Sequence, residues 1–229
     1  MKITILTLFP KIFDQFIKTS IVGRAVRNHK VKIQIINFRD YSFDKRNYKV
    51  DDTPYGGGSG MVLSIEPLVN AIHDLKKSNS KVVLLTPSGT IFKQNIAKHF
   101  LRYNHLIFIC GHYEGFDERI KKYVDFEISI GDYILTGGEI PAMALVETIC
   151  RLLPNVIKQE SVANESFEQS LLDFPAYTKP RDFEGHKVPD VLLSGNHKDI
   201  EKFRLEQRVI RTKNNRPDLY EKYLERKGE

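Results

Sequence analysis

The sequence has few cysteines and no long apolar run. Cys110 and Cys150 are the two cysteines among 229 residues, and neither stands in a pair with metal-ligand spacing. Two cysteines do not make a disulfide framework, so a reducing cytoplasm is the expected setting. No apolar run approaches the length that spans a bilayer, so no membrane partner is expected. The apolar start at residues 1–8 lacks a basic leader and a cleavage site, which is typical of a first strand.

The best-known phosphate-binding motifs are also missing. Residues 54–61 read Pro-Tyr-Gly-Gly-Gly-Ser-Gly-Met, a loop that can expose main-chain N–H groups to a ligand. No Gly-Lys-Ser/Thr follows, which argues against a P-loop phosphotransferase, and the dinucleotide fingerprint fails at Met61. A flexible surface turn has the same composition, so this loop by itself identifies no function.

Positive charge is unevenly distributed along the chain. Residues 1–60 carry 11 Lys and Arg against five acids, whereas residues 61–229 carry 24 of each sign. A second basic stretch lies at residues 202–216, where Arg204, Arg208 and Arg211 would share one helix face. Leu205 and Val209 would lie on another face and could anchor that helix. A solvated helix face is the simplest interpretation, and a phosphate-binding face for nucleic acid is the alternative.

Strand-like and helix-like segments alternate over the first two-thirds of the chain. Most strand candidates are continuous apolar runs, which predicts an α/β fold with a largely parallel sheet covered on both faces. We expect strands at residues 3–8, 31–37, 82–86, 106–110 and 126–130. We expect helices at residues 10–18, 65–77, 91–100 and 116–123. Thr136 and Glu139 are spaced as a capping box before a further helix at 141–153.

The texture changes after Pro154. Residues 158–170 are polar without a clear period, which predicts a mobile linker. Four prolines and helical patterns at 197–210 and 217–226 then indicate a small helical domain. The predicted organisation is a domain at 1–157, a linker at 158–170 and a second domain at 171–229.

Three glycine-bearing loops follow predicted strands, at residues 86–89, 111–115 and 130–139. The carboxyl ends of parallel strands meet at one edge of a sheet, where α/β proteins bind ligands. A pocket rich in main-chain groups, with an apolar wall from Ile130, Ile134 and Leu135, would suit an adenine base. Each loop alone could be an ordinary tight turn, but three in register favour a cofactor site.

Long segments of the chain resemble signature segments of one family, the TrmD family of tRNA (guanine-N1)-methyltransferases. In the first domain they are residues 54–61, 111–115 with Asp117-Glu118-Arg119, and 130–141. In the second they are residues 171–180 and 192–197. The resemblance runs nearly end to end and in the family's order.

The resemblance implies a fold, a cofactor and a substrate. The fold would be the SPOUT type, an α/β domain whose C-terminal part is threaded into a trefoil knot, which periodicity does not show. The protein would act on guanine 37 of tRNA as a homodimer with shared active sites. Magnesium dependence is a further family trait, although the sequence shows no metal cage. S-adenosyl-L-methionine would be held by Leu85, Thr86, Pro87, Gly111, Tyr113, Glu114, Gly115, Ile130, Gly131, Asp132, Tyr133, Ile134, Leu135 and Gly138.

Methylation of guanine N1 sets its own chemical requirements. A general base must remove the N1 proton, and a cation should stabilise the charge that develops on O6. The family's base is an aspartate in an Asp-Ser-Phe segment, and here Glu165 takes its place before Ser166. We expect Glu165 to be the base and Arg151 to stabilise the charge. Asp173 would bond the guanine edge and is the second candidate for the base.

The remaining candidates concern the RNA. The target base must leave its stack to be reached. Ser166 would help to hold the flipped base, and Asn196 could also cap a helix. The substrate-binding set is Ser166, Gly57, Gly58, Asn196, Arg204, Arg208 and Arg211. The main alternative function is a tRNA-binding module of the same fold with impaired catalysis, which the replacement of aspartate by Glu165 would favour.

Overall fold

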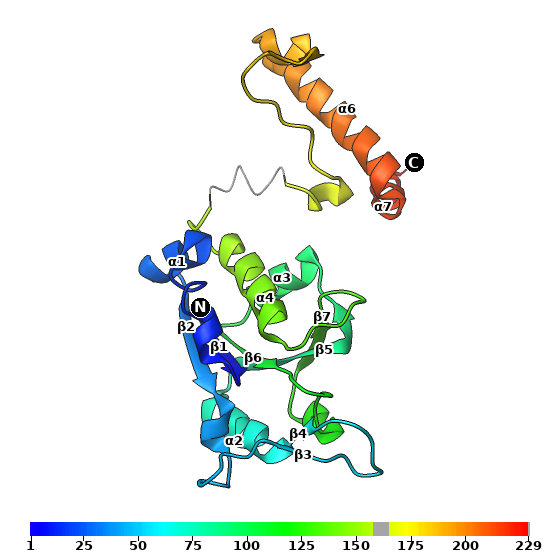
Figure 1. Ribbon diagram of the computed structural model, residues 1–229. Coiled ribbons are helices and arrows are strands. Elements are labelled where there is room, and N and C mark those ends of the chain that lie inside the picture. The colour runs from blue at the N-terminus through cyan, green and yellow to red at the C-terminus, as the bar shows by residue number, and fades with distance from the viewer. Residues whose placement is uncertain (158–164, 229) are drawn as a thin grey trace. The chain divides into compact units, whose positions relative to one another are not determined.

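The computed structural model describes residues 1–157 and 165–228 (Figure 1). The chain divides into two compact units, residues 1–157 and residues 158–229. Most of the linker expected at 158–170 lies outside the described residues, whereas residues 168–170 pack against the last helix of the second unit. None of the described helices is long and apolar enough to cross a membrane.

A five-stranded parallel sheet forms the centre of the first unit. Its order is β2-β1-β6-β5-β7, so the first two strands lie at one edge and the last at the other. The central strands β1 and β6 and the first half of β5 are buried because their apolar runs face helices on both sides. All five predicted strands are confirmed, as β1 (Lys2–Thr7), β2 (Lys32–Asn37), β5 (Ser80–Ile91), β6 (His105–Cys110) and β7 (Phe126–Ser129).

Helices cover both faces of this sheet (Figure 1). On one face α1 (Ser20–Arg27), α3 (Gln94–Phe100) and α4 (Glu139–Leu152) enclose a core that contains Phe13, Phe100 and Phe108. On the other face α2 (Ile65–Leu75) covers a second core with Phe38 at its centre. Short 3-10 helices complete the unit at η1 (Pro10–Phe13), η2 (Phe38–Tyr41) and η3 (Glu118–Lys122).

Three helix predictions for this unit were wrong in detail. The helix expected at residues 116–123 forms only the five-residue 3-10 helix η3. Residues 10–18 form the single 3-10 turn η1 followed by hydrogen-bonded turns, and the true helix is α1. Thr136 does not cap α4, because the helix begins after Gly138 with no side-chain cap. Glu139 uses its carboxylate elsewhere, in a buried contact described below.

The second unit is small and helical. Asn196 caps α6, since its side chain accepts a hydrogen bond from Lys198 N at 3.2 Å. The core includes Leu171, Thr212 and Tyr223, and α6 packs against α7. The expected anchor Leu205 is 46% exposed, so that expectation was wrong for this residue. The elements are η4 (Glu168–Ser170), β8 (Asp182–Phe183), β9 (His186–Lys187), η5 (Asp190–Leu193), α6 (His197–Asn215) and α7 (Pro217–Lys227).

Candidate active site

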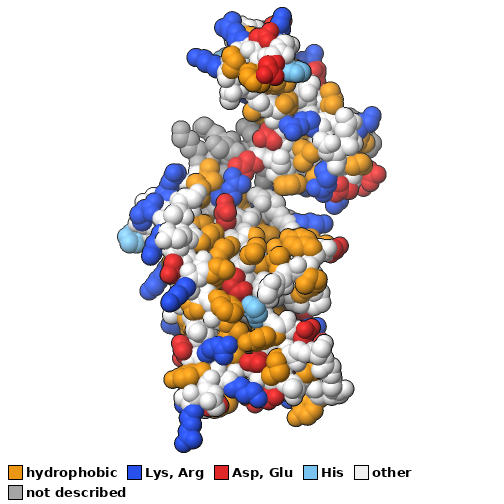
Figure 2. Space-filling view, viewed as in Figure 1, with side chains coloured by type: hydrophobic (Ala, Val, Ile, Leu, Met, Phe, Trp, Pro, Cys, Tyr) orange, Lys and Arg blue, Asp and Glu red, His pale blue; other side chains and the backbone are white. Residues whose placement is uncertain are grey.

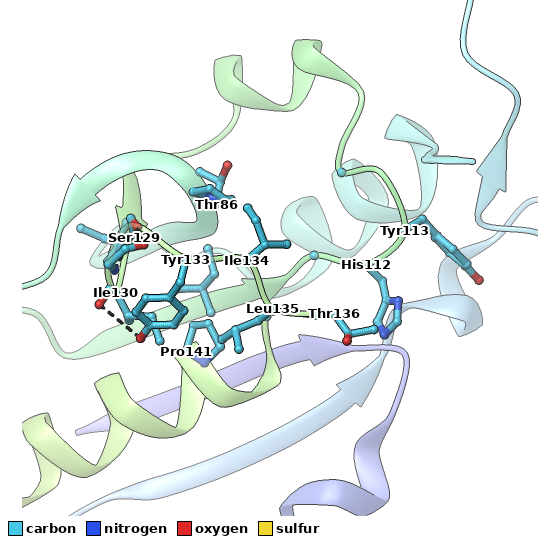
Figure 3. A pocket seen from close by; sticks show the side chains of 18 of the residues that line it. Thr86, His112, Tyr113, Ser129, Ile130, Tyr133, Ile134, Leu135, Thr136 and Pro141 are labelled. Carbon is cyan, nitrogen blue, oxygen red and sulfur yellow. Dashed lines mark hydrogen bonds between the residues drawn. The ribbon is translucent and has the colours of Figure 1, made fainter. Parts of the chain in front are cut away.

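A cavity of about 270 Å³ opens at the carboxyl ends of β6 and β7 and at an interruption within β5 (Figure 3). All of the expected cofactor residues except Asp132 line it, and Asp132 is exposed nearby in the chain. The three loops therefore meet at one edge of the sheet, as the positions of the strands predicted. The lining also contains residues that were not among the expected cofactor residues, namely His112, Ile128, Ser129, Thr136, Gly137 and Pro141.

The first wall is an interruption in β5. The pairing of β5 with β7 runs to Leu85, breaks, and resumes at Thr90. The break carries Thr86 and Pro87 into the cavity lining. Gly89 allows the strand to return, because a Cβ there would lie 2.4 Å from the main-chain nitrogen of Ile128.

The second wall is the loop after β6. Tyr113 has a φ of 58°, a left-handed conformation that is uncommon for a residue with a side chain. Its ring packs edge-on against His112 at an interplanar angle of 66°, and the His112 ring lies 4.9 Å from the ring of Phe9. Arg39 donates a hydrogen bond to the Tyr113 hydroxyl at 3.4 Å. Contacts from two distant segments thus hold this loop in its strained form.

The third wall is the loop between β7 and α4. Gly131 has a φ of 148°, and its main chain exchanges hydrogen bonds with Ser129 Oγ at 3.1 and 3.2 Å. The Tyr133 ring folds back over Gly131, and its hydroxyl donates to Ile130 O at 3.5 Å (Figure 3). Ile134 remains 81% exposed at the pocket mouth, so it is free to contact a ligand or a second protein.

The third loop closes tightly on the second. Gly138 N donates to Gly111 O at 2.9 Å, and a Cβ on Gly138 would lie 2.6 Å from Cys110 Cα. A Cβ on Gly137 would instead meet side chains, at 2.4 Å from the Glu139 carboxylate and 2.9 Å from the His112 ring. The close approach of the two main chains therefore requires glycine at position 138 above all.

A buried carboxylate lies beneath this crossing. Glu139 is 6% exposed and accepts a hydrogen bond from Thr7 Oγ1 at 2.7 Å. Burial and then Glu139 raise the pKa of the Cys110 thiol well above its usual range. Burial also raises the pKa of Cys150 to about 12. Neither thiol is suited to act as a nucleophile near neutral pH.

The glycine loop at 54–61 is attached to the pocket at its downstream end. It lies between β3 (Asp51–Asp52) and β4 (Val62–Leu63), which pair antiparallel. Glu114 N donates to Met61 O at 3.0 Å, and Gly60 packs against the Glu114 side chain. Gly57 and Gly58 both have positive φ and no close side-chain contact, so they present main chain on the surface of the unit.

The candidate catalytic carboxylates of the second unit share one turn. Ser166 Oγ accepts a hydrogen bond from Asp173 N at 3.0 Å, and Phe167 N donates to Leu171 O at 2.8 Å. Asp173 Oδ1 accepts from Phe174 N at 2.8 Å, which leaves its second oxygen for other partners. Glu165 is half-buried directly before Ser166. The structure therefore brings Glu165-Ser166 beside Asp173 within this unit.

The three arginines of α6 are not equivalent. Arg208 is 7% exposed, and its Nε donates to Leu172 O at 3.1 Å. Arg204 stacks on the Phe174 ring at 4.7 Å, and Arg211 donates to Asp173 O at 3.3 Å. The expectation of three phosphate-binding arginines thus needs correction for Arg208, because its burial makes it a support of the 172–174 segment.

Arg151 lies in the last turn of α4, half-buried and in the first unit. Among the described residues no group of three or more His, Cys, Asp and Glu side chains could hold a metal ion. We therefore assign no residue of the described segments to the magnesium ion that the resemblance implies.

A parallel sheet with a glycine-lined cavity at its carboxyl edge defines an α/β protein that binds a small ligand at that edge. A family model described as tRNA (Guanine-1)-methyltransferase TrmD matches residues 1–222. The chain belongs to this family and is a methyltransferase.

Curated relatives agree over almost the whole length of the chain. A tRNA (guanine-N(1)-)-methyltransferase of Malacoplasma penetrans is 61% identical over 224 residues, 98% of this chain and 99% of the relative. Its counterpart in Ureaplasma parvum is 55% identical over 228 residues, 99% of this chain and 100% of the relative. A Staphylococcus aureus protein of the same name is 53% identical over 226 residues, which is 97% of this chain and 92% of the relative.

Proposed function

We propose that the protein transfers a methyl group from S-adenosylmethionine to N1 of guanine 37 in tRNA, in the cytoplasm. Membership of the family supports the reaction class and the tRNA substrate. The observation that carries the proposal is the convergence of three glycine-bearing loops on one cavity. The position in tRNA and the residue roles below come from the resemblance of the sequence motifs.

The chemistry of the cavity fits S-adenosylmethionine. Its volume of about 270 Å³ lies close to the lower end, roughly 300 Å³, of typical ligand pockets. The lining combines main-chain groups of Gly111, Gly131 and Gly138 with the apolar side chains of Leu85 and Leu135. Main-chain groups can bond an adenine edge and ribose hydroxyls, while apolar walls cover the ring faces. When bound, S-adenosylmethionine supplies a methyl group that is already activated on a sulfonium.

The residues of the chain would manage the proton and the charge of guanine. Glu165 would take the N1 proton from its half-buried position beside Ser166, whose hydroxyl bonds Asp173 N. Arg151 would stabilise the negative charge on O6. Asp173, with one oxygen engaged by Phe174 N, would accept from an N–H of the guanine edge. The side chain of Glu165 is one methylene longer than that of the family's aspartate, so its carboxylate lies farther from the main chain. A shift in the position of the 165–173 turn would compensate for this difference.

A second copy of the chain would complete the site, as the family resemblance implies. The first unit exposes large apolar side chains beside the cavity mouth, where Phe9 and Ile140 flank the Thr7–Glu139 bond and Ile134 projects from the third loop. Figure 2 shows hydrophobic side chains gathered on this face of the unit. Such a patch is typical of a protein interface. We propose that it is buried in a homodimer and that the chain crossing at Gly111 and Gly138 belongs to a trefoil knot.

A methyl-transfer assay tests the proposal. Purified protein, S-adenosylmethionine and a tRNA transcript with guanine 37 are incubated, and the digested nucleosides are analysed by mass spectrometry. N1-methylguanosine is expected from this transcript and not from a transcript with adenine 37. If the protein binds both ligands but forms no product, the proposed enzyme is wrong and a tRNA-binding module is the better description. Binding of ATP in place of S-adenosylmethionine would instead favour a phosphotransferase.

A further inference from the structure

The net positive charge of the chain comes entirely from its first 37 residues. This segment holds seven of the 35 Lys and Arg residues and one acid, Asp14, whereas residues 38–229 hold 28 residues of each sign. The segment forms β1, η1, α1 and β2, at one edge of the sheet. Among the described residues, no lining residue of the cavity comes from it. The charge therefore needs an explanation apart from the cofactor pocket.

Much of this charge gathers around α1. Arg24 and Arg27 lie three positions apart and are both exposed, whereas Val22 and Ala25 of the same helix are buried in the core. Lys18 is exposed immediately before the helix, and Lys30 is half-buried in the turn after it. We call the following four residues the α1 basic cluster: Lys18, Arg24, Arg27 and Lys30.

Short contacts hold the cluster in place. Arg27 Nη1 donates to Lys18 O at 2.8 Å, and Gly23 lets the two segments touch because a Cβ there would lie 2.3 Å from Lys18 O. Lys30 N donates to Ala25 O at 2.9 Å. The ammonium group of Met1 donates to Lys30 O at 3.2 Å, which adds a further positive charge. These bonds fix the Arg27 guanidinium and the main chain of Lys18 and Lys30 before any ligand arrives.

Negative charge near the cluster is sparse. No acid occurs between Asp14 and Asp40, and no carboxylate among the described residues forms an ion pair with the cluster. The helix α4 packs against α1 and brings Glu147 and Arg151, one charge of each sign. Figure 2 shows blue side chains along the edge of the unit where α1 lies. An exposed, unneutralised group of cations of this kind attracts polyanions.

We propose that the α1 basic cluster binds the phosphate backbone of the tRNA substrate, an inference that rests on the proposed function. An RNA backbone carries one negative charge per nucleotide, so each of several spaced cations can neutralise one phosphate. Such contacts position the RNA without reading its sequence. The exposed neighbours Ser20 and Asn28 are polar, and α1 exposes no large apolar side chain of the kind that anchors an interfacial helix in a membrane. The cluster therefore fits RNA better than a lipid surface.

A triple variant, Lys18→Gln, Arg24→Gln and Lys30→Gln, tests the cluster. Arg27 is left intact because its guanidinium bonds Lys18 O. We expect tRNA affinity at 0.1 M salt to fall about tenfold or more, and the slope of log affinity against log salt to fall by roughly 2. The KM for tRNA should rise while kcat and the affinity for S-adenosylmethionine stay unchanged. Filter binding across a salt series and steady-state kinetics measure these quantities.

A matched variant separates local binding from general charge. The control is a triple variant that removes three exposed cations elsewhere on the same unit: Lys77→Gln, Lys93→Gln and Lys122→Gln. It should leave the salt slope near the wild-type value. The charge-retaining variant Lys18→Arg, Arg24→Lys and Lys30→Arg should bind like the wild type. The proposal is overturned if the cluster variant keeps the wild-type salt slope. It is also overturned if the cluster variant and the Lys77, Lys93 and Lys122 variant lose tRNA affinity equally. A wild-type protein that binds tRNA through the cluster but forms no N1-methylguanosine contradicts the proposed function alone.

Discussion

The hydroxyl of Thr7 donates a 2.7 Å hydrogen bond to the carboxylate of Glu139, across 132 positions of the sequence. Thr7 ends β1 and Glu139 begins α4. The same hydroxyl oxygen accepts from Phe9 N at 2.9 Å, so one side chain orders both the turn after β1 and the start of the helix. Since Gly137 touches the Glu139 carboxylate, the bond also supports a wall of the cavity.

Replacement of Thr7 by Val should test this support. The new side chain keeps the shape but leaves a buried carboxylate without its hydroxyl donor, so the free energy of unfolding should fall by about 2 kcal/mol. Urea denaturation measures the loss. Thr148→Val is the control, because the Thr148 hydroxyl bonds Ala144 O within its own helix and the change should cost much less. Equal costs for the two variants would show that the Thr7 contact has no special weight.

Gly138→Ala should weaken cofactor binding while the fold persists. The added Cβ would meet Cys110 Cα at 2.6 Å and Gly111 N at 2.8 Å, and main chain cannot rotate away as a side chain can. We expect the affinity for S-adenosylmethionine to fall at least about tenfold, because small misplacements of a binding loop are costly. Calorimetric titration measures it.

Gly195→Ala provides the comparison for that change. Gly195 has a φ of 73° and no atom within 4 Å of the added Cβ. Its substitution should cost about 1–2 kcal/mol of stability from the left-handed main chain, with no change in cofactor affinity. Unchanged affinity in Gly138→Ala would mean that the main chains of Gly111 and Gly138 can move apart without a change in the cavity.

Glu165→Gln and Asp173→Asn should separate the two candidate bases. The amide that replaces the Glu165 carboxylate cannot take a proton, so kcat should fall by roughly 10²–10⁴ while the cofactor still binds. An amide oxygen at position 173 can still accept from Phe174 N, so the local turn should survive and the loss should be smaller. Single-turnover kinetics with excess enzyme measures both. The reverse order of effects would assign the base to Asp173.

The arginines of α6 should divide into two classes. Arg208→Ala removes a buried donor from Leu172 O, so thermal unfolding should show a loss of about 2 kcal/mol or more. The double variant of the exposed residues, Arg204→Gln with Arg211→Gln, should lose less stability. It should lower the slope of log tRNA affinity against log salt by roughly 1.5. An unchanged salt slope in the pair would remove the phosphate-binding role from this helix.

Stability should depend on His105 between about pH 4 and pH 6.5. Burial, followed by the positive charges of Lys2 and Lys77, lowers the pKa of His105 from 6.5 to about 4. The folded protein therefore holds the neutral ring, which bonds Thr4 and Ser80, while the unfolded chain takes up a proton below pH 6.5. The stabilisation is complete above pH 6.5 and is lost as the pH falls toward 4, by roughly 3 kcal/mol.

His105→Gln should remove that slope. Its urea denaturation midpoint should change less than that of the wild type over this pH interval, after the carboxylates that titrate in both proteins are accounted for. A parallel pH dependence in the two proteins would show that His105 titrates alike in the folded and unfolded chain.

The strands were predictable because their apolar runs are local and continuous. The helix α1 was not, because Ile21, Val22 and Gly23 disfavour a helix locally and the burial of Val22 and Ala25 overrides that preference. Residues 10–18 misled for the opposite reason, since their apolar spacing imitates one helix while the chain makes consecutive turns.

The cavity was predictable for a geometric reason. Strand ends of a parallel sheet meet at one edge, so glycine-bearing loops after strands were enough to locate it. The bond between Thr7 and Glu139 and the burial of Arg208 depend on contacts between distant segments. No local pattern carries such contacts, and Arg208 in particular looks like any other member of a basic helix face.

A pocket lined so largely by main chain also limits how the protein could evade an inhibitor. A compound that bonds the peptide groups of Gly111, Gly131 and Gly138 would meet few side chains whose replacement could weaken it. A new side chain at Gly138 would collide with the main chain of Cys110 and Gly111, and one at Gly111 would collide with the ring of Phe116. Resistance by point mutation would therefore have to damage the binding of the natural ligand as well.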